Sequence, residues 1–182
     1  MFSLELYYFI SDYNKTEIQN LDKKINIIYR NYNKKTDLKT ILDIKSGCRK
    51  YNKKFYISNN IKLALKLNLD GVYIPAFNRT FKMKYTTRKN FTILGSAHNL
   101  KEIKIKEKQG VNSIFLSPVF EVSKKKNFLG IYRFNILSKL TKKRVIALGG
   151  INKKNINKLK LLKCDGFGSI SYIKNRNNEY RK

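Results

Sequence analysis

The sequence has few residues of the kinds that stabilise secreted, metal-binding or membrane-spanning chains. Its two cysteines, Cys48 and Cys164, form neither a metal-ligand spacing nor a disulfide framework, which fits a reducing cytosol. No apolar run approaches the ~18 residues that a membrane span needs. The apolar start of the chain contains Glu5 and no basic segment, so it does not predict a signal peptide. We therefore expect a cytoplasmic protein without a membrane partner.

Acidic residues are also scarce, with 12 Asp and Glu against 40 Lys and Arg, which gives a formal net charge of +28 at pH 7. Such an excess can attract nucleic acid, because basic side chains release counterions from phosphates. The basic residues are, however, spread along the whole chain. Lys, Asn, Ile, Tyr and Phe are all abundant and share A/T-rich codons, so compositional drift also explains the charge. Nucleic-acid binding stays an alternative, and we do not expect it.

Short apolar runs alternate with longer Lys-rich stretches along the chain. Each run is rich in Ile, Val, Phe or Tyr, which is typical of strands covered on both faces. The only prolines, Pro75 and Pro118, fall at or near the ends of such runs. The eight predicted strands are Glu5–Ser11, Ile25–Arg30, Lys54–Ser58, Gly71–Pro75, Phe91–His98, Ser113–Phe120, Val145–Ile151 and Gly166–Ile173.

Amphipathic stretches between most of these strands predict helices. Asn99 and Glu102 have the spacing of a capping box. Eight strand–helix units without a linker predict an α/β fold, a compact (β/α)8 TIM barrel with clipped helices over residues 1–174 and a polar tail over residues 175–182. The predicted helices are Asp37–Asn52, Ile61–Leu67, Asn99–Gln109, Arg133–Thr141 and Asn155–Lys163.

Glycines mark the ends of the last two predicted strands. Gly149 and Gly150 follow the seventh, and Ile170 and Ser171 follow the glycines of the eighth. In such barrels the strand ends seven and eight form a phosphate site, because glycines let backbone N–H groups approach an anion. We expect these four residues to bind a small phosphorylated substrate. The alternative is that the glycines only allow tight turns.

Histidine occurs once, at the end of the fifth predicted strand. Alternation along the strand places Ser96 on the same face as His98. A histidine at the mouth of a barrel can act as a general base, although a lone histidine is more often structural. Glu121, after the sixth strand, offers a carboxylate at the mouth. His98 and Glu121 are therefore the candidate catalytic residues.

Basic residues after strands two and six are candidates for substrate binding. Arg30 ends strand two and suits a phosphate or a carboxylate. Lys124 and Lys125 belong to a lysine cluster after strand six that could close over an anion. The alternative is a solvated basic loop, since lysine is abundant throughout.

Four segments after residue 91 are similar to the thiamine phosphate synthase/TenI family in order and spacing. They read ILGSAHN (93–99), GVNSIFLSPVFEVSKKK (110–126), VIALGGIN (145–152) and CDGFGSISYI (164–173). Upstream, LYYFISD, IIYRNYNKK and KFYISNNIKLALKLNLDGVYIP match more weakly, so the resemblance covers nearly the whole chain. It implies a compact eight-stranded α/β barrel that acts in thiamine biosynthesis.

The resemblance also implies roles for individual residues. Ser96 matches a serine near the pyrimidine diphosphate, and Arg30 matches the arginine of a Gln-x-Arg-x-Lys motif. In the tautomerase branch of the family, a histidine at the position of His98 is a general acid/base. The phosphate of thiazole phosphate or thiamine phosphate would be held by Gly149, Gly150, Ile170 and Ser171.

The chain departs from the family pattern on one side of the site. Ile28 and Tyr32 replace the Gln and Lys of the motif around Arg30. Asn59 and Asn78 stand where the synthases have magnesium-binding aspartates, and Asn is a neutral substitute. We therefore expect an eroded magnesium–diphosphate half, no metal site, and Mg²⁺ as a cofactor only if synthase activity is retained.

Three hypotheses remain open at this point. The first is an enzyme acting on thiazole phosphate, either a synthase-like transferase or a tautomerase-like isomerase using His98. The second is a non-catalytic thiamine phosphate binder. The third is a basic nucleic-acid-binding protein on a barrel scaffold. The sequence also leaves open whether the chain forms a homo-oligomer.

Overall fold

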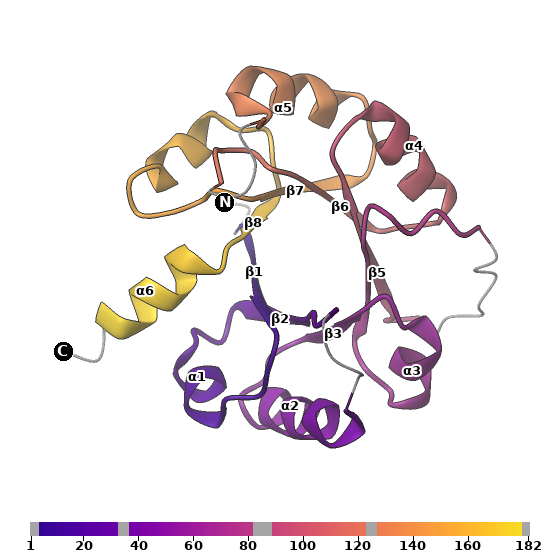
Figure 1. The fold of residues 1–182 in the computed structure, drawn as a ribbon, viewed down its shortest axis with the longest axis vertical. Coiled ribbons are helices and arrows are strands. Elements are labelled where there is room, and N and C mark those ends of the chain that lie inside the picture. Colours follow the sequence, from indigo (N-terminus) through magenta and orange to yellow (C-terminus); the bar gives the residue numbers. More distant parts are fainter. Residues whose placement is uncertain (1–3, 33–36, 82–88, 123–126, 180–182) are drawn as a thin grey trace.

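Eight parallel strands close into one barrel (Figure 1). The computed structural model describes residues 4–32, 37–81, 89–122 and 127–179, with the backbone alone from residue 177. Each strand pairs with the next, and β8 pairs with β1 through Glu5 and Gly166, which confirms the predicted TIM barrel. The strands are β1 (Glu5–Ile10), β2 (Ile25–Tyr29), β3 (Phe55–Ser58), β4 (Gly71–Ile74), β5 (Thr92–Ala97), β6 (Ser113–Leu116), β7 (Arg144–Leu148) and β8 (Gly166–Gly168).

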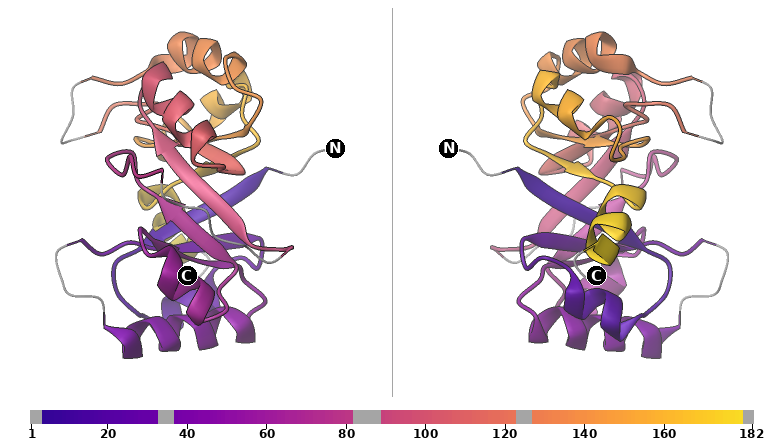
Figure 2. Two further views of the ribbon diagram at one scale, coloured as in Figure 1. Left: turned by 90° about the vertical axis from the view of Figure 1, so that its right-hand side faces the viewer. Right: turned by 90° about the vertical axis from the view of Figure 1, so that its left-hand side faces the viewer.

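Helices surround the barrel, as Figures 1 and 2 show. Asp37, Asn60 and Asn99 cap three of them with side-chain oxygens that accept backbone N–H groups. None of the helices in the described ranges has both the length and the apolar character that a bilayer span requires. The helices are α1 (Lys15–Asn20), α2 (Leu38–Lys50), α3 (Ile61–Lys66), α4 (Leu100–Lys108), α5 (Gly130–Lys139), the 3-10 helix η1 (Ile156–Leu161) and α6 (Ser171–Glu179).

The boundaries differ from the sequence-based expectation at several elements. The predicted strand Ser113–Phe120 ends at Leu116, shortly before Pro118, which has no N–H to continue the ladder. The predicted strand Gly166–Ile173 ends at Gly168, and its last residues begin α6 instead. Helix α6 then continues to Glu179, past the end expected for the barrel. The segment after β7 forms a short 3-10 helix, not an α-helix.

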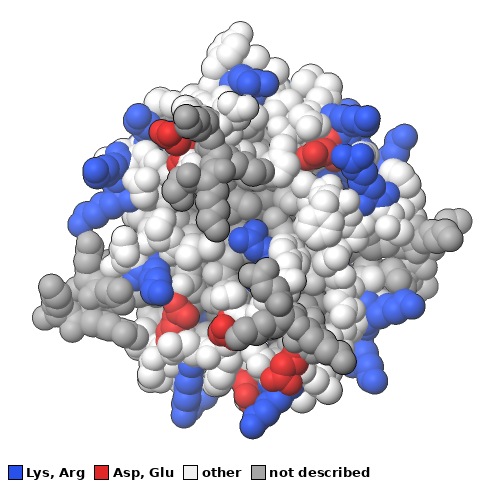
Figure 3. All heavy atoms as spheres, viewed as in Figure 1, with Lys and Arg blue, Asp and Glu red and all other residues white. Residues whose placement is uncertain are grey.

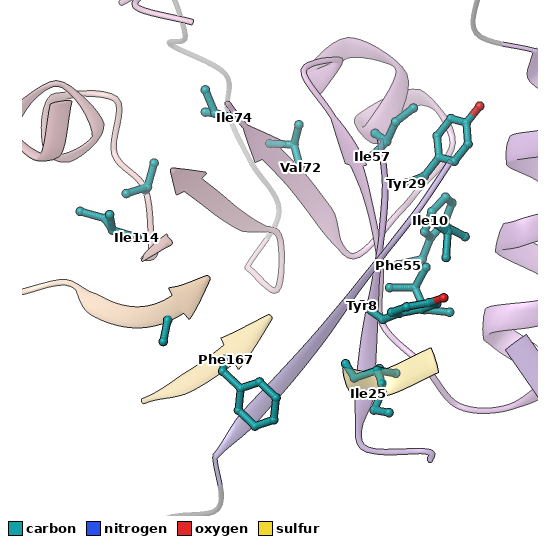
Figure 4. Packing of buried hydrophobic residues seen from close by; sticks show 14 of the residues in the cluster. Tyr8, Ile10, Ile25, Tyr29, Phe55, Ile57, Val72, Ile74, Ile114 and Phe167 are labelled. Atoms are coloured by element: carbon teal, nitrogen blue, oxygen red, sulfur yellow. The ribbon is translucent and has the colours of Figure 1, made fainter. Parts of the chain in front are cut away.

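Two apolar layers fill the fold. The interior of the barrel is packed with aromatic rings, including Tyr7 against Phe115 (centroids 4.9 Å apart) and Phe9 against Tyr73 (5.3 Å). The opposite faces of the strands pack against the helices (Figure 4). Because the interior is filled with side chains, a ligand can enter only at an end of the barrel.

A buried lysine fastens the loop after β4 to helix α4. The side chain of Lys106 is fully buried, and Nζ donates to Pro75 O (2.8 Å), Asn78 O (2.7 Å) and Gln109 Oε1 (2.9 Å). Gln109 Nε2 donates to Asn78 O as well (3.0 Å). Gly95 leaves room for the lysine stem, since a Cβ there would lie 3.0 Å from Lys106 Cδ. Lys106 therefore helps to hold the loop that carries Asn78.

Burial lowers the pKa of Lys106 from its ordinary 10.5 to about 8, with Glu102 opposing and Arg79 adding to the shift. Between these pH values Lys106 keeps its proton in the unfolded chain and has released it in the folded chain. Its contribution to the free energy of unfolding therefore rises with pH. The difference in unfolding free energy between wild type and Lys106→Met should therefore increase by on the order of 2 kcal/mol over this window. Urea denaturation at several pH values measures it. A difference in unfolding free energy that stays constant or falls as the pH rises would contradict the lowered pKa of Lys106.

Candidate functional site at the barrel mouth

A cavity of about 540 Å³ opens where the strands end. Figure 3 looks onto this end of the barrel, where one basic side chain stands near the centre and others are scattered around the rim among acidic ones. Three of the lining residues, His98, Ser117 and Pro118, also line a more open hollow beside it. The lining residues are Phe9, Arg30, His98, Ser117, Pro118, Val122, Leu148, Gly149, Gly150, Ile151, Gly168, Ser169, Ile170 and Ser171.

The segment after β7 turns its N–H groups to one side. Leu148 O accepts Val119 N–H (2.9 Å), and Gly149 O accepts Phe120 N–H (3.1 Å). Successive carbonyls of a strand alternate in direction, and the φ angles of Gly149 (91°) and Gly150 (72°) break that alternation. In a trans peptide N–H points opposite to C=O, so the N–H groups of both glycines point away from residues 119–120. Neither has an acceptor among the described residues.

The segment after β8 is tied to the glycine segment by hydroxyl groups. Ser169 Oγ donates to Ile151 O (2.8 Å), and Ser171 Oγ donates to the same carbonyl (3.3 Å). Ser171 begins α6, so its N–H and that of Ile170 lie at the N-terminal end of a helix, and within the described part of the chain they too lack an acceptor. The structure thus brings all four predicted phosphate-binding residues to one cavity.

His98 follows β5 and lines the same cavity. Its Nδ1 lies 2.5 Å from Ser117 O and 3.3 Å from Ser117 Oγ. Because a carbonyl can only accept, Nδ1 carries a proton, and in the neutral ring Nε2 keeps a free lone pair. The carboxylate of Glu102 accepts the backbone N–H of His98 (2.7 Å), whereas the expected capping box would have it reach the N–H of Asn99.

Two predicted substrate-binding residues have different positions. The guanidinium of Arg30 lies 4.7 Å from the ring centroid of Phe9 and borders the cavity. Ser96 is buried on the inward face of β5 and is not a lining residue. Burial raises the pKa of the neighbouring Tyr73 to about 12, and hydrogen bonds from Ser96 and Arg30 oppose this shift. Ser96 therefore lies below the cavity floor.

The loop after β6 contributes less than the sequence suggests. The side chain of Glu121 is exposed and outside the cavity lining, and it has no hydrogen bond to His98 within the described ranges. Its part in catalysis stays a prediction. Lys124 and Lys125 lie outside the described residues. The loop instead supplies the carbonyl of Ser117, which orients His98 and which no sequence motif indicated.

Amides and aromatic rings occupy the side of the mouth formed by β2 to β4. Asn78 Nδ2 donates to Asn59 Oδ1 (2.7 Å), so the two residues at the expected metal positions do meet. Tyr32 packs edge-on against Phe77 (5.6 Å), and its hydroxyl hydrogen-bonds Ser58 Oγ (2.9 Å). The described residues contain no group of three or more His, Cys, Asp or Glu that could hold a metal. A neutral amide pair is a poor match for Mg²⁺, which prefers carboxylates.

Comparison with known proteins assigns the family. The family model of thiamine monophosphate synthase (TMP-TENI) matches residues 15–173. A thiamine-phosphate synthase of Prochlorococcus marinus (strain AS9601) is 33% identical over 158 residues, covering 82% of this chain and 43% of that protein. One of Helicobacter pylori (strain J99) is 28% identical over 138 residues, covering 72% of this chain and 63% of that protein.

The solved structures agree in fold. A thiamine phosphate pyrophosphorylase from Pyrococcus furiosus superposes with a TM-score of 0.77 at 21% identity, covering 98% of this chain and 94% of that one. The chain spans less than half the length of the Prochlorococcus relatives. Since the family model covers most of the chain, the chain belongs to the thiamine monophosphate synthase (TMP-TENI) family.

Proposed function

We propose that this chain binds the phosphate of thiazole phosphate or thiamine phosphate between the ends of β7 and β8. The observation that supports this most is the set of N–H groups of Gly149, Gly150, Ile170 and Ser171, which border one cavity without acceptors in the described structure. Hydrogen bonds to a charged group contribute roughly 1.5–3 kcal/mol each. The N-terminus of α6 adds a favourable dipole, and Arg30 adds a positive charge.

A second candidate function is isomerisation of a thiazole phosphate with His98 as the acid/base. It is supported by the tautomer that Ser117 O selects, because Nε2 is then able to accept a proton. Nε2 would take a proton from the ring of the bound phosphate ester and return it at another ring position, so that substrate and product have the same composition. Glu121 stays a proposed residue that assists or orients His98.

The binding proposal is tested by calorimetry with thiazole phosphate, thiamine phosphate and the dephosphorylated thiazole alcohol. We expect the phosphorylated ligands to bind more tightly than the alcohol, because only they engage the backbone N–H groups. Equal affinity for the ester and the alcohol would overturn the proposal. Tight binding of duplex or single-stranded nucleic acid at physiological salt would favour the nucleic-acid alternative, although the basic side chains in Figure 3 are scattered.

We further propose that the magnesium–diphosphate half of the site does not operate. Purified protein given thiazole phosphate and the pyrimidine diphosphate should form little thiamine phosphate, and Mg²⁺ should not stimulate it, because Asn59 and Asn78 carry no charge. Efficient Mg²⁺-stimulated synthesis would refute this. The double variant Asn59→Asp/Asn78→Asp, which restores both carboxylates, should bind Mg²⁺ more tightly than wild type. The charge-matched control is Asn90→Asp/Asn157→Asp, at two exposed residues outside the lining of this cavity.

A further inference from the structure

Two asparagines after the glycine pair hold one carbonyl of the cavity wall. Asn155 Nδ2 donates to Gly150 O (2.7 Å), and Asn152 Nδ2 donates to the same oxygen (3.2 Å). Asn155 Oδ1 in turn accepts the N–H of Asn152 (2.9 Å). Asn155 therefore uses both ends of its amide inside this turn, and Asn152 adds a second donor to Gly150 O.

Holding this carbonyl determines where the next N–H points. Gly150 O and the N–H of Ile151 belong to one trans peptide, so they point in opposite directions. With the carbonyl turned toward the asparagines, the N–H of Ile151 is turned away from them, and Ile151 is a lining residue of the cavity. Within the described ranges this N–H has no acceptor. Without the two amides, the peptide beside a glycine with positive φ could rotate at little cost.

Every backbone carbonyl from Leu148 to Ile151 accepts a hydrogen bond from outside the glycine pair. The carbonyls of Leu148 and Gly149 are held by residues 119–120, and that of Gly150 by the asparagines. The carbonyl of Ile151 is held by the hydroxyls of Ser169 and Ser171. Successive N–H groups left free in this way form a concave anion-binding site.

We infer that Asn155, assisted by Asn152, is a positioning residue that fixes the peptide between Gly150 and Ile151 and makes the N–H of Ile151 a further donor to the ligand phosphate. The inference rests on the proposed phosphate site. It assigns Asn155 no contact with the ligand; its effect is to order a glycine segment before the ligand arrives, which lowers the entropic cost of binding.

The test compares Asn155→Leu with Asn157→Leu, an exposed asparagine two positions later in η1 that receives the same substitution. Calorimetry measures the affinity of each variant for thiazole phosphate and for the dephosphorylated alcohol. We expect Asn155→Leu to bind the phosphate ester ~10-fold more weakly and the alcohol as wild type does, because one charge-assisted hydrogen bond is lost. Asn157→Leu should match wild type for both ligands. Asn152→Leu should give a smaller loss for the ester alone.

The outcomes distinguish a failure of the phosphate site from a failure of the positioning role of Asn155. If wild type does not prefer the ester to the alcohol, the phosphate site itself is wrong and this inference falls with it. If wild type prefers the ester and Asn155→Leu binds it equally well, only the positioning role is wrong. An equal loss for ester and alcohol would mean a structural role and would also overturn the inference. Should Asn155→Leu fail to fold, the ester-to-alcohol ratio of Asn152→Leu decides in the same way.

Discussion

Replacement of His98 by alanine is expected to slow isomerisation of a thiazole phosphate by roughly 10²–10⁴-fold, the usual contribution of general acid–base catalysis. Affinity for the phosphate ester should stay nearly unchanged, because the proposed phosphate donors are backbone groups of other segments. His98 is the only histidine in the chain, and Nε2 has no hydrogen-bond partner among the described residues. Steady-state kinetics and calorimetry on the same preparation separate the two effects.

The variant His98→Asn distinguishes a catalytic from a structural role. An asparagine amide can still donate to Ser117 O, as Nδ1 of His98 does, but it cannot accept a proton at neutral pH. If His98 moves the proton, His98→Asn should be as slow as His98→Ala. An asparagine variant that keeps most of the wild-type rate would show that the histidine only holds the loop after β6.

Replacement of Gly150 by valine should destabilise the fold and weaken the phosphate site together. A Cβ at this position would lie 2.5 Å from Glu121 O and from Phe120 O, both backbone atoms that cannot move independently. Valine is also strained at a φ of 72°. We expect the free energy of unfolding to fall by about 3 kcal/mol or more. Any folded fraction should bind the phosphate ester more weakly by roughly 1–3 kcal/mol.

Gly110→Val is the matched control for Gly150→Val. Gly110 has a similar φ of 74°, yet a Cβ there would meet nothing within 4 Å. Valine at position 110 would therefore have the backbone strain without the clash. This strain should cost about 1–2 kcal/mol. Urea denaturation of both variants isolates the effect of the clash. Equal losses, or unchanged ester affinity in folded Gly150→Val, would contradict the close approach of the segments after β6 and β7.

Local patterns were sufficient to predict the barrel and part of the site. Alternation along β5 predicts Ser96 on the inward face, and in the structure it hydrogen-bonds Tyr73, a residue of the barrel interior. The glycines at the ends of β7 and β8 line one cavity together with His98. The end of β8 was wrong because the residues after Gly168 read as an apolar run. Ser169 Oγ accepts the N–H of Tyr172 there (3.2 Å), which is a local helix cap, and the hydroxyls of Ser169 and Ser171 also donate to Ile151 O.

The contacts that orient the site could not be predicted from the sequence. The carbonyl that holds His98 comes from Ser117, 19 positions away, and a backbone acceptor leaves no trace in residue type. The amide of Asn155 could have been suspected from Asn152 and Asn155 following the glycine pair, because asparagine often caps turns. Its direction toward Gly150 O depends on the turn geometry, which composition does not reveal.

An amide NMR titration with thiazole phosphate tests the central claim most directly, because it observes the proposed donors themselves. We predict that the amide signals of Gly149, Gly150, Ile170 and Ser171 shift together and saturate with one dissociation constant, and that the dephosphorylated alcohol shifts them far less. Shifts confined to other parts of the barrel, or equal shifts with ester and alcohol, would contradict the proposal that these N–H groups bind the phosphate.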